Sequence, residues 1–488
     1  MARILPIKRR SRTRPRSRSG ALARHRAFAG LTAALCTGAS AAPADDRLSA
    51  VDLLQRAIRI QTTRPSPIPD AERSLAALYV EALRRAGLEA TLVDTPAGPG
   101  GERTAAAFAR LRGSGDGAAT LLLSHLDVVP ANPALWKHDP YAGRREGGFV
   151  IGRGALDAKG VSVVHLAALA ELAARPKRLR RDVVFLATPG EETGGRDGAG
   201  YLTRERADLL RGVDGALTEG GGIHRSKDGA SVWGVSVTEK TPCWIQVRAR
   251  GEPGHSSAPT PDTAVHRLIA ALDRVRRIET PVRVVPAVAR MFRELAPLAP
   301  VEDRDSYARL SQALAEDSTF RRRFLGNPAR AALVRNTIAI TMLEGAPRTN
   351  VLPARARARL DTRLLPGDDC AGFRDELAAV IDDRAVELEI ELAFAAAQSA
   401  TDTKLFRAVE VVAAELDPDA RVVPRLVAGF TDAHWLRERG IPTYGFVPRW
   451  LSSGESRRIH GPGERISEEN LQRGIRTTVR ILEVLDLF

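Results

Sequence analysis

The sequence predicts an α/β protein with a mostly parallel sheet flanked by helices, interrupted by an inserted α+β domain. Before residue 219 and again after residue 401, short apolar strands alternate with helical segments, as in sheets with helices on both faces. Between these regions, segments such as 244–250 and 354–364 alternate apolar and polar side chains, which is typical of half-exposed antiparallel strands. We therefore expect one domain built from residues 45–239 and 397–488, with a second domain inserted at 240–396.

Hydrophobic periodicity places the individual elements. The predicted helices are 49–62, 70–87, 161–174, 263–277, 369–383, 401–415, 432–439 and the chain from Glu468, and 302–335 is a charged, helix-favouring stretch. The predicted strands are 91–93, 105–111, 119–124, 183–188, 215–218, 231–238, 244–250, 336–343, 354–364, 386–394, 421–424 and 444–447. Of these, 231–238 is expected to be half-exposed and antiparallel.

The N-terminal segment has the composition of an export signal. The first 26 residues carry ten Lys or Arg residues and no acidic residue. An apolar run over 27–35 and small residues around Ala39 and Ala42 follow, so residues 1–44 match a cleaved export signal. The protein is then periplasmic or secreted; a misannotated start codon is the alternative and would make it cytoplasmic. The apolar run is too short to remain as a membrane anchor.

Positive charge outside this leader is modest. Removing its ten charges from the formal net charge of +14 leaves +4. Net charge was the only feature favouring a nucleic-acid partner, so we expect none.

Cys243 and Cys370 are the only cysteines after the leader. Two isolated cysteines form neither a disulfide framework nor a metal-binding knuckle. We expect two buried or half-buried thiols, with a single bridge between them as the alternative.

Four apolar runs each lead into acidic residues or a histidine. Residues 119–123 lead to His125 and Asp127, 149–154 to Asp157, 182–188 to Glu191 and Glu192, and 215–218 to Glu219. Ligands of open α/β sheets collect at the carboxyl ends of strands, so these side chains are expected to share one crevice. Five carboxylates there would repel one another, and burial would raise their pKa values. Divalent cations remove this cost, and the sequence therefore predicts a metal-dependent hydrolase.

The pair Glu191 and Glu192 indicates a division of labour. Adjacent side chains diverge, so one carboxylate binds metal while the other stays free as a general base. Asp127 lies two residues after His125, and in extended chain both side chains point the same way. A carboxylate in that position can accept the second N–H of a metal-binding imidazole and fix its tautomer.

A charge count favours two metal ions. Two Zn²⁺ balance three carboxylates and one shared hydroxide if Asp157, Glu192 and Glu219 bind metal together with two neutral imidazoles. Glu191 would then take a proton from the water and pass it to the leaving nitrogen. His460, in a Gly/Pro-rich loop after the final sheet strand, is the best candidate for the second imidazole. Nitrogen and oxygen ligands suit zinc, with cobalt or manganese as alternatives.

Together these motifs resemble the M20 family of zinc peptidases, over nearly all of the chain after the leader. The stretches that carry the resemblance are 124–130, 152–160, 190–192, 219–221, 254–259, 350–353 and 458–462. The resemblance implies two metal ions held by five residues: His125, Asp157, Glu192, Glu219 and His460. It also implies that Asp157 bridges the ions, that Asp127 orients His125, and that Glu191 is the catalytic base.

The same resemblance identifies the inserted domain as a lid. It implies that His255 polarises the scissile carbonyl and that Asn350 and Arg363 bind the substrate. In dimeric members this histidine comes from the partner subunit, so a homodimer formed through the lid would matter for catalysis. Glu219 in place of Asp, and an added helical stretch near 281–335, resemble the carboxypeptidase S and N-acyl amino acid hydrolase branch.

We therefore expect hydrolysis of an amide bond next to a free carboxylate, as by a carboxypeptidase or dipeptidase acting on peptides. The alternative is an N-acyl amino acid amidohydrolase, and a remote alternative is an inactive exported binding protein that uses the same crevice. Arg363 suits a bidentate grip on the free carboxylate. His434 stands where the family more usually has Arg, and no role is assigned to it.

Overall fold

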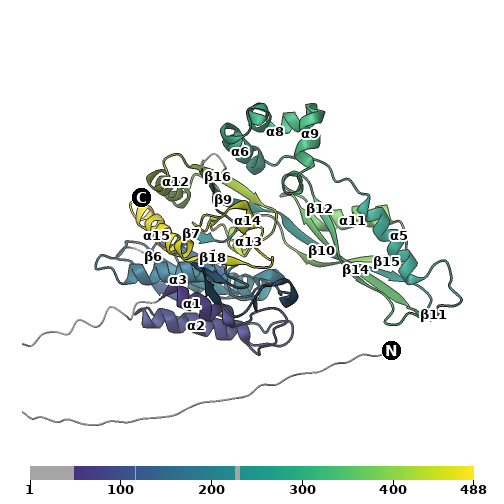
Figure 1. Cartoon of the computed structure of the whole chain (residues 1–488), viewed down its shortest axis with the longest axis horizontal. Helices are drawn as coiled ribbons and strands as arrows, with labels where there is room; N and C mark the ends of the chain where they lie inside the picture. The colour runs from purple at the N-terminus through teal and green to yellow at the C-terminus, as the bar shows by residue number, and fades with distance from the viewer. Residues whose placement is uncertain (1–48, 116, 226–230) are drawn as a thin grey trace, which may run out of the picture. The chain divides into compact units, whose positions relative to one another are not determined.

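The computed structural model describes residues 49–115, 117–225 and 231–488 (Figure 1). The predicted export segment, residues 1–44, lies outside these ranges. Within them, we find no helix that combines the length and the hydropathy needed to cross a bilayer.

The large sheet has nine strands in the order β1-β2-β6-β3-β7-β17-β9-β16, and β8 also pairs with β9. Its strands are β1 (Ala90–Thr95), β2 (Thr104–Leu111), β3 (Ala119–His125), β6 (Asp182–Thr188), β7 (Val213–Thr218), β8 (Gly222–Arg225), β9 (Ser231–Glu239), β16 (Arg421–Val427) and β17 (Thr443–Gly445). The neighbours β6, β3, β7 and β17 are parallel, as are β9 and β16. The pairs β1–β2, β2–β6 and β17–β9 are antiparallel. The predicted mostly parallel sheet is therefore confirmed.

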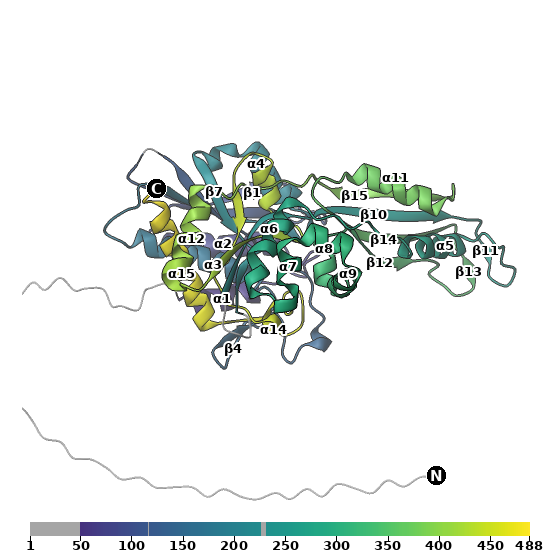
Figure 2. The same cartoon turned by 90° about the horizontal axis from the view of Figure 1, so that it is seen from above.

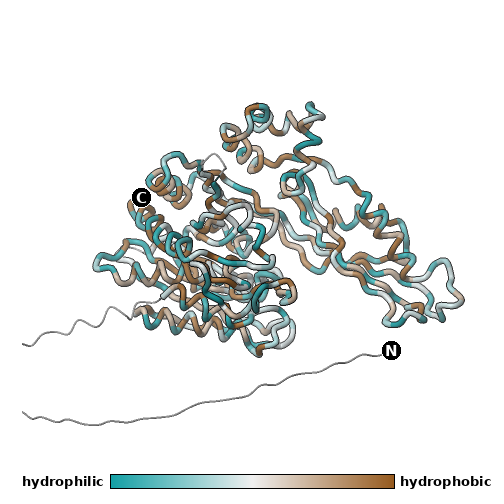
Figure 3. Tube along the Cα trace, in the orientation of Figure 1, coloured by the Kyte–Doolittle hydropathy of each residue, from teal (hydrophilic) through white to brown (hydrophobic). Residues whose placement is uncertain are grey.

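Helices cover both faces of the large sheet. Successive side chains of a strand point to opposite faces, so β3 and β6 each contribute to two hydrophobic clusters. On one face, Leu122 and Phe185 belong to a core shared with α1, α2, α3, α12 and α15. On the other face, Leu121 and Leu186 pack with α4 and α13. These helices are α1 (Ala50–Arg59), α2 (Ala71–Arg85), α3 (Lys159–Ala173), α4 (Tyr201–Glu205), α12 (Lys404–Leu416), α13 (Ala433–Arg437) and α15 (Glu468–Leu485). Figure 3 shows hydrophobic stretches concentrated in this region.

Strand β9 is not half-exposed, and that expectation for residues 231–238 is wrong. Every residue of β9 except Val232 is buried, because the strand lies between β17 and β16. Its polar side chains find partners inside the protein instead of water. Thr238 Oγ1 donates to the carbonyl of Ala397 at 3.1 Å, and Glu239 Oε1 accepts from Arg437 Nη1 at 3.0 Å.

The lid is built on a four-stranded antiparallel sheet in the order β12-β14-β10-β15. Its strands are β10 (Thr241–Arg250), β12 (Thr337–Glu344), β14 (Arg355–Leu364) and β15 (Val386–Ala393), with α5 (Ala264–Arg276) and α11 (Cys370–Ile381) packed on it. In β14, buried and more exposed residues alternate, as its sequence predicts. Figure 2 shows these strands side by side, with β11 (Gly254–His255) and β13 (Val351–Leu352) near one end.

A disulfide joins Cys243 to Cys370 in the lid, with Cα atoms 5.5 Å apart. The expectation of two free thiols is wrong, and the bridge left as the alternative is what the structure shows. Cys243 lies near the start of β10 and Cys370 begins α11. The sheet and the helix that packs on it are thereby linked covalently.

The helical stretch predicted near 281–335 forms a hydrophobic cluster separate from the core on either face of the large sheet. It contains α6 (Pro286–Leu295), α7 (Arg304–Ala308), α8 (Leu310–Glu316), α9 (Ser318–Leu325) and α10 (Pro328–Ala331). Phe292 and Phe324 pack in one cluster with Val423 and Leu426 of β16. These helices therefore pack on the edge strand of the large sheet, although in sequence they lie between lid strands.

Candidate metal centre

His125 and Asp127 lie at the end of β3 and are held in place by hydrogen bonds. Both side chains are buried. The His125 Nδ1–H donates to the backbone carbonyl of Asp127 at 2.9 Å, and Nδ1 lies 3.4 Å from the Asp127 carboxylate. That carboxylate also accepts the backbone N–H groups of Glu191 and Glu192, both at 3.0 Å. Asp127 thus ties the imidazole to the turn that carries the two glutamates and leaves Nε2 facing the other acidic groups.

Asp157 lies between the two imidazoles. Its Oδ1 is 3.0 Å from His125 Nε2, and its Oδ2 is 3.2 Å from His460 Nε2. Glu219 Oε1 is 3.3 Å from His125 Nε2, and Glu192 Oε1 is 3.1 Å from His460 Nε2. The five predicted ligands therefore meet as two adjacent half-sites that share one carboxylate.

Asp157 reaches this position from a loop and not, as expected, from the end of a strand in the large sheet. The apolar run before it forms β5 (Phe149–Ile151), which belongs to a separate three-stranded sheet with β4 (Arg144–Glu146) and β18 (Arg465–Ser467). Glu464 Oε1 accepts the backbone N–H groups of Leu156 and Asp157 at 2.7 and 3.1 Å. Arg153 Nη1 donates to the other oxygen of Glu464 at 2.5 Å, and both side chains are buried. Sequence reasoning missed this support, although Glu464 lies only four residues after His460.

Burial and neighbouring charges shift the pKa values of the clustered acidic groups. Burial raises the pKa of Glu219 to about 8, with the nearby Asp157 carboxylate adding to the rise. Burial, and then Glu219, raise the pKa of Glu191 well above its usual range, and burial also raises that of Glu192. Hydrogen bonds from the two histidines outweigh burial at Asp157 and hold its pKa well below the usual range. Two groups of side chains, His125 with Asp157 and Glu192 and His125 with Glu191 and Glu219, have ligand atoms within 4.8 Å of one another. This nitrogen and oxygen donor set fits divalent cations.

Glu191 is buried and lies slightly apart from the other acidic groups. Its Oε2 is 3.9 Å from His125 Nε2, farther than any of the four contacts made by the predicted ligands. It starts a short turn, Glu191–Thr193, which Gly195 follows with φ of 63°. A Cβ at Gly195 would lie 2.0 Å from Asp432 Oδ1, so glycine is required for this close packing. The turn holds the Glu191 carboxylate beside the five predicted ligands.

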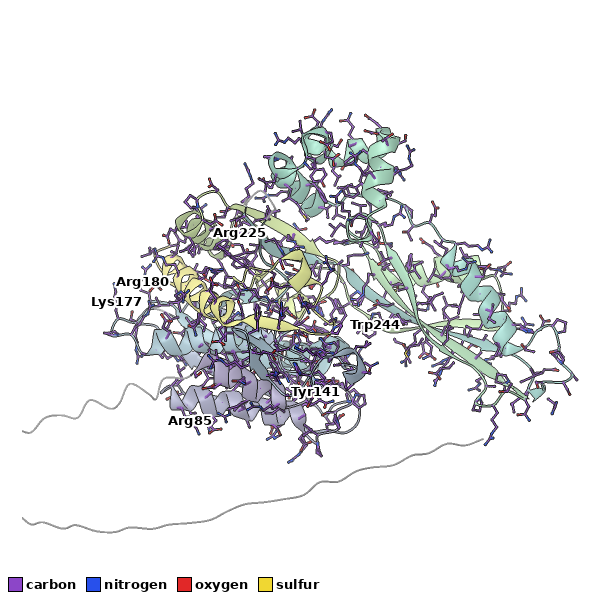
Figure 4. All side chains as sticks on the ribbon, viewed as in Figure 1. Arg85, Tyr141, Lys177, Arg180, Arg225 and Trp244 are labelled. Carbon is purple, nitrogen blue, oxygen red and sulfur yellow. A yellow bond between two sulfur atoms is a disulfide. The ribbon has the colours of Figure 1, made fainter. Side chains whose placement is uncertain are left out.

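A cavity of about 550 Å³ opens over the centre and includes two lid residues, Trp244 and Arg363. Trp244, labelled in Figure 4, comes from β10. Its ring packs against Phe430 with ring centres 6.1 Å apart. The Arg363 guanidinium lies 4.9 Å from the centre of the Phe430 ring. It is already paired with Asp361, through Nε at 2.6 Å and Nη2 at 3.0 Å. Among the described residues, Arg363 Nη1 is buried with no hydrogen-bond partner, so one donor remains for a ligand.

His255 and Asn350 do not line this cavity. His255 is in β11, which pairs with β13 beyond the end of β10, and the backbone N–H of Ser256 donates to the carbonyl of Asn350 at 3.3 Å. His255 is exposed, and its Nδ1 lies 2.7 Å from Ser257 Oγ. Two of the predicted substrate-side residues therefore lie together, but apart from the cavity of their own chain.

His434 is a packing residue. It is fully buried and stacks on Phe394 with ring centres 3.5 Å apart, and its Nδ1–H donates to the carbonyl of Thr431 at 2.8 Å. Burial lowers its pKa to about 3, so the ring is neutral. Two other cavity residues, Arg425 and Arg449, had no signal in the sequence, because single arginines on or after a strand are common.

Comparisons with known proteins identify the family of this chain. The model of peptidase family M20/M25/M40 matches residues 121–484. The N-fatty-acyl-amino acid synthase/hydrolase PM20D1.1 of Danio rerio is 29% identical over 72% of this chain and 69% of its own length. Human aminoacylase-1 is 26% identical over 89% of this chain and 95% of its own length. In fold, the chain is similar to the M20 metallo-carboxypeptidase Sso-CP2 of Sulfolobus solfataricus, with a TM-score of 0.67 and 18% identity over 90% of this chain and 99% of that one.

The family model covers most of the chain and includes the metal-centre residues from His125 to His460. The chain therefore belongs to peptidase family M20/M25/M40, whose members are metal-dependent hydrolases of amide bonds.

Proposed function

We propose that this chain hydrolyses the amide bond of an N-acyl amino acid at a centre of two divalent metal ions. The position of Asp157, with one carboxylate oxygen toward each imidazole, carries the proposal. His125 and Glu219 would complete one half-site with it, and His460 and Glu192 the other.

The residues of the chain divide the chemistry among them. When bound, two divalent ions would lower the pKa of a water molecule and polarise the scissile carbonyl. Glu191 would accept a proton from water and return it to the leaving nitrogen. Asp127 keeps the protonated Nδ1 of His125 directed away from the centre, so that Nε2 is free to bind metal. The free Nη1 of Arg363 would bind the substrate carboxylate.

Zinc is the proposed metal, because the donor set is imidazole nitrogen and carboxylate oxygen with no thiolate. Cobalt and manganese accept the same donors. Removing metal with a chelator is expected to abolish hydrolysis, and two equivalents of Zn²⁺ should restore it. The measurement is amidase rate against metal content per chain. Metal-free protein that keeps its rate would contradict the two-ion centre.

The N-acyl substrate is proposed because sequence-similar relatives are named as an N-fatty-acyl-amino acid hydrolase and an aminoacylase. The cavity also has apolar lining beside the polar centre, from Val427, Phe430, Leu451 and Ile459, which suits an acyl group. A carboxypeptidase or dipeptidase is the second candidate, favoured by the fold similarity to a metallo-carboxypeptidase. Values of kcat/KM for N-acetyl-leucine and glycyl-leucine, which share a leaving residue, separate the two.

We also propose that His255 acts in the cavity of a partner subunit within a homodimer. It is exposed near one end of the lid sheet, outside the cavity of its own chain. His255→Ala is expected to lower kcat by about 10²–10³-fold, as does loss of one oxyanion donor, while metal content stays unchanged. Metal loss in this variant would instead make His255 a ligand.

Mixed subunits test whether His255 acts in trans. Co-expressed Glu191→Gln and His255→Ala chains should regain about a quarter of wild-type activity, since half of random dimers are mixed and each holds one complete site. A mixture as inactive as the two separate variants would contradict the proposal.

Finally, we propose that the mature protein works in an oxidising compartment after removal of a segment within residues 1–44. The disulfide between Cys243 and Cys370 supports this, because such bridges persist in exported proteins. N-terminal sequencing of protein purified from its native host is the test.

A further inference from the structure

The cavity contains a cation that the proposed mechanism does not use. Three arginines line it, Arg363, Arg425 and Arg449. Arg363 is paired with Asp361, as described above. Arg449 is buried and donates to the carbonyl of Leu156 at 2.6 Å; burial lowers its pKa, and the nearby carboxylates of Asp157 and Glu219 oppose this effect. Arg363 is therefore ion-paired, whereas Arg449 makes no ion pair among the described residues but lies close enough to two carboxylates to be affected by their charge.

Across the described ranges, no carboxylate acts on Arg425 in this way. Among the described residues, no carboxylate lies within ion-pair distance of it, and its Nη1 meets only His224 Nε2, at 3.4 Å. Burial lowers the pKa of Arg425, and no acidic group opposes this effect. Burial, and then Arg425 itself, lower the pKa of His224, so the imidazole is neutral and Nε2 accepts. A neutral ring does not compensate a partly buried guanidinium, which is costly unless an anion pairs with it.

The neighbouring strand is shaped to admit this side chain. Arg425 is on β16, which runs parallel to β9. A Cβ at Gly234 of β9 would lie 2.4 Å from Arg425 Cδ and 3.2 Å from its Nη1. Glycine at this position therefore leaves the room that the arginine side chain occupies.

We propose that Arg425, positioned by His224, forms a subsite for a second carboxylate of the substrate, besides the one assigned to Arg363. A planar guanidinium binds a carboxylate through two parallel N–H groups. The substrate class is then an N-acyl or peptidyl amino acid that carries an additional carboxylate, on the amino acid side chain or on the acyl group. This inference rests on the proposed amide hydrolysis.

Matched substrates test the subsite and locate the carboxylate. N-acetyl-glutamate and N-acetyl-glutamine differ by one charge on the amino acid side, and N-succinyl-leucine and N-butyryl-leucine differ by one on the acyl side. In Arg425→Met, kcat/KM for one of the two acidic substrates should fall about 10- to 100-fold, as expected for loss of a charged hydrogen-bonded pair. The neutral partner should change less than about threefold. The control is Arg421→Met, the same change at an exposed residue of the same strand, and it should leave all four substrates unaffected.

Equal losses for acidic and neutral substrates would overturn the proposal, because Arg425 would then serve a group common to all of them or the fold itself. Calorimetric titration with glutarate and with butyrate gives a readout that needs no turnover. Arg425→Met should weaken glutarate binding at least tenfold and leave butyrate binding unchanged, whereas equal affinities in wild type and variant would overturn the subsite. If wild type hydrolyses none of the four substrates, the proposed function fails, while the glutarate titration still reports on Arg425.

Discussion

Asp157→Asn is expected to empty both half-sites and to reduce hydrolysis to below about a thousandth of the wild-type rate, since the chemistry depends on the paired ions. The substitution keeps the shape of the side chain but removes its charge and one of two oxygens. Those oxygens lie 3.0 and 3.2 Å from the two imidazoles, so each half-site loses part of its ligand set. Loss of an outer partner of a metal ligand already costs about 10–100-fold in metal affinity, and loss of the shared ligand should cost more.

The measurement is metal content per chain by elemental analysis after dialysis, together with kcat. Asp52→Asn is the matched control, because Asp52 is an exposed residue of α1 and the same chemical change there should alter neither quantity. A variant that retains two ions per chain would show that Asp157 does not join the half-sites.

The strand-end reasoning succeeded where the residues follow neighbouring parallel strands. His125 ends β3, and Glu191 and Glu219 come after β6 and β7; these three strands are adjacent in the sheet. The carboxyl ends of such strands meet at one edge, so apolar runs in the sequence were enough to group these side chains. His460 was found differently, from a Gly/Pro-rich loop after the last sheet strand.

Asp157 lies beside the residues predicted as its neighbours, but it does not follow a strand of the large sheet. Its apolar run forms a strand of a separate small sheet, and a buried pair, Arg153 and Glu464, holds its loop in place. Such a pair joins residues 311 positions apart, and no local pattern reveals it. The bridge between Cys243 and Cys370 spans 127 positions, and for the same reason it is predicted from the sequence only as the alternative to two free thiols.

The sequence pattern also does not predict which polar residues are buried. Alternation of apolar and polar residues in β9 predicts exposure, but Thr238 and Glu239 form hydrogen bonds with partners inside the protein. Arg425 is a related case, because an arginine on a strand is ordinarily directed to solvent. Two features mark it as unusual: the packing of its side chain against Gly234, and the lack of an acidic partner in the part of the chain that the structure describes.

Glu191→Gln is expected to separate metal binding from catalysis. The amide has the size of the carboxylate but cannot accept the proton that the reaction releases, so kcat should fall by about 10²–10⁴-fold, the usual contribution of a general base. Metal content should remain at two ions per chain, because Glu191 Oε2 lies 3.9 Å from His125 Nε2, outside the 3.0–3.3 Å contacts of the predicted ligands. Glu192→Gln, one residue away, is the matched comparison and should lose metal from the His460 half-site. Near-normal turnover in Glu191→Gln would refute the base assignment, and metal loss there would mean that Glu191 and Glu192 exchange roles.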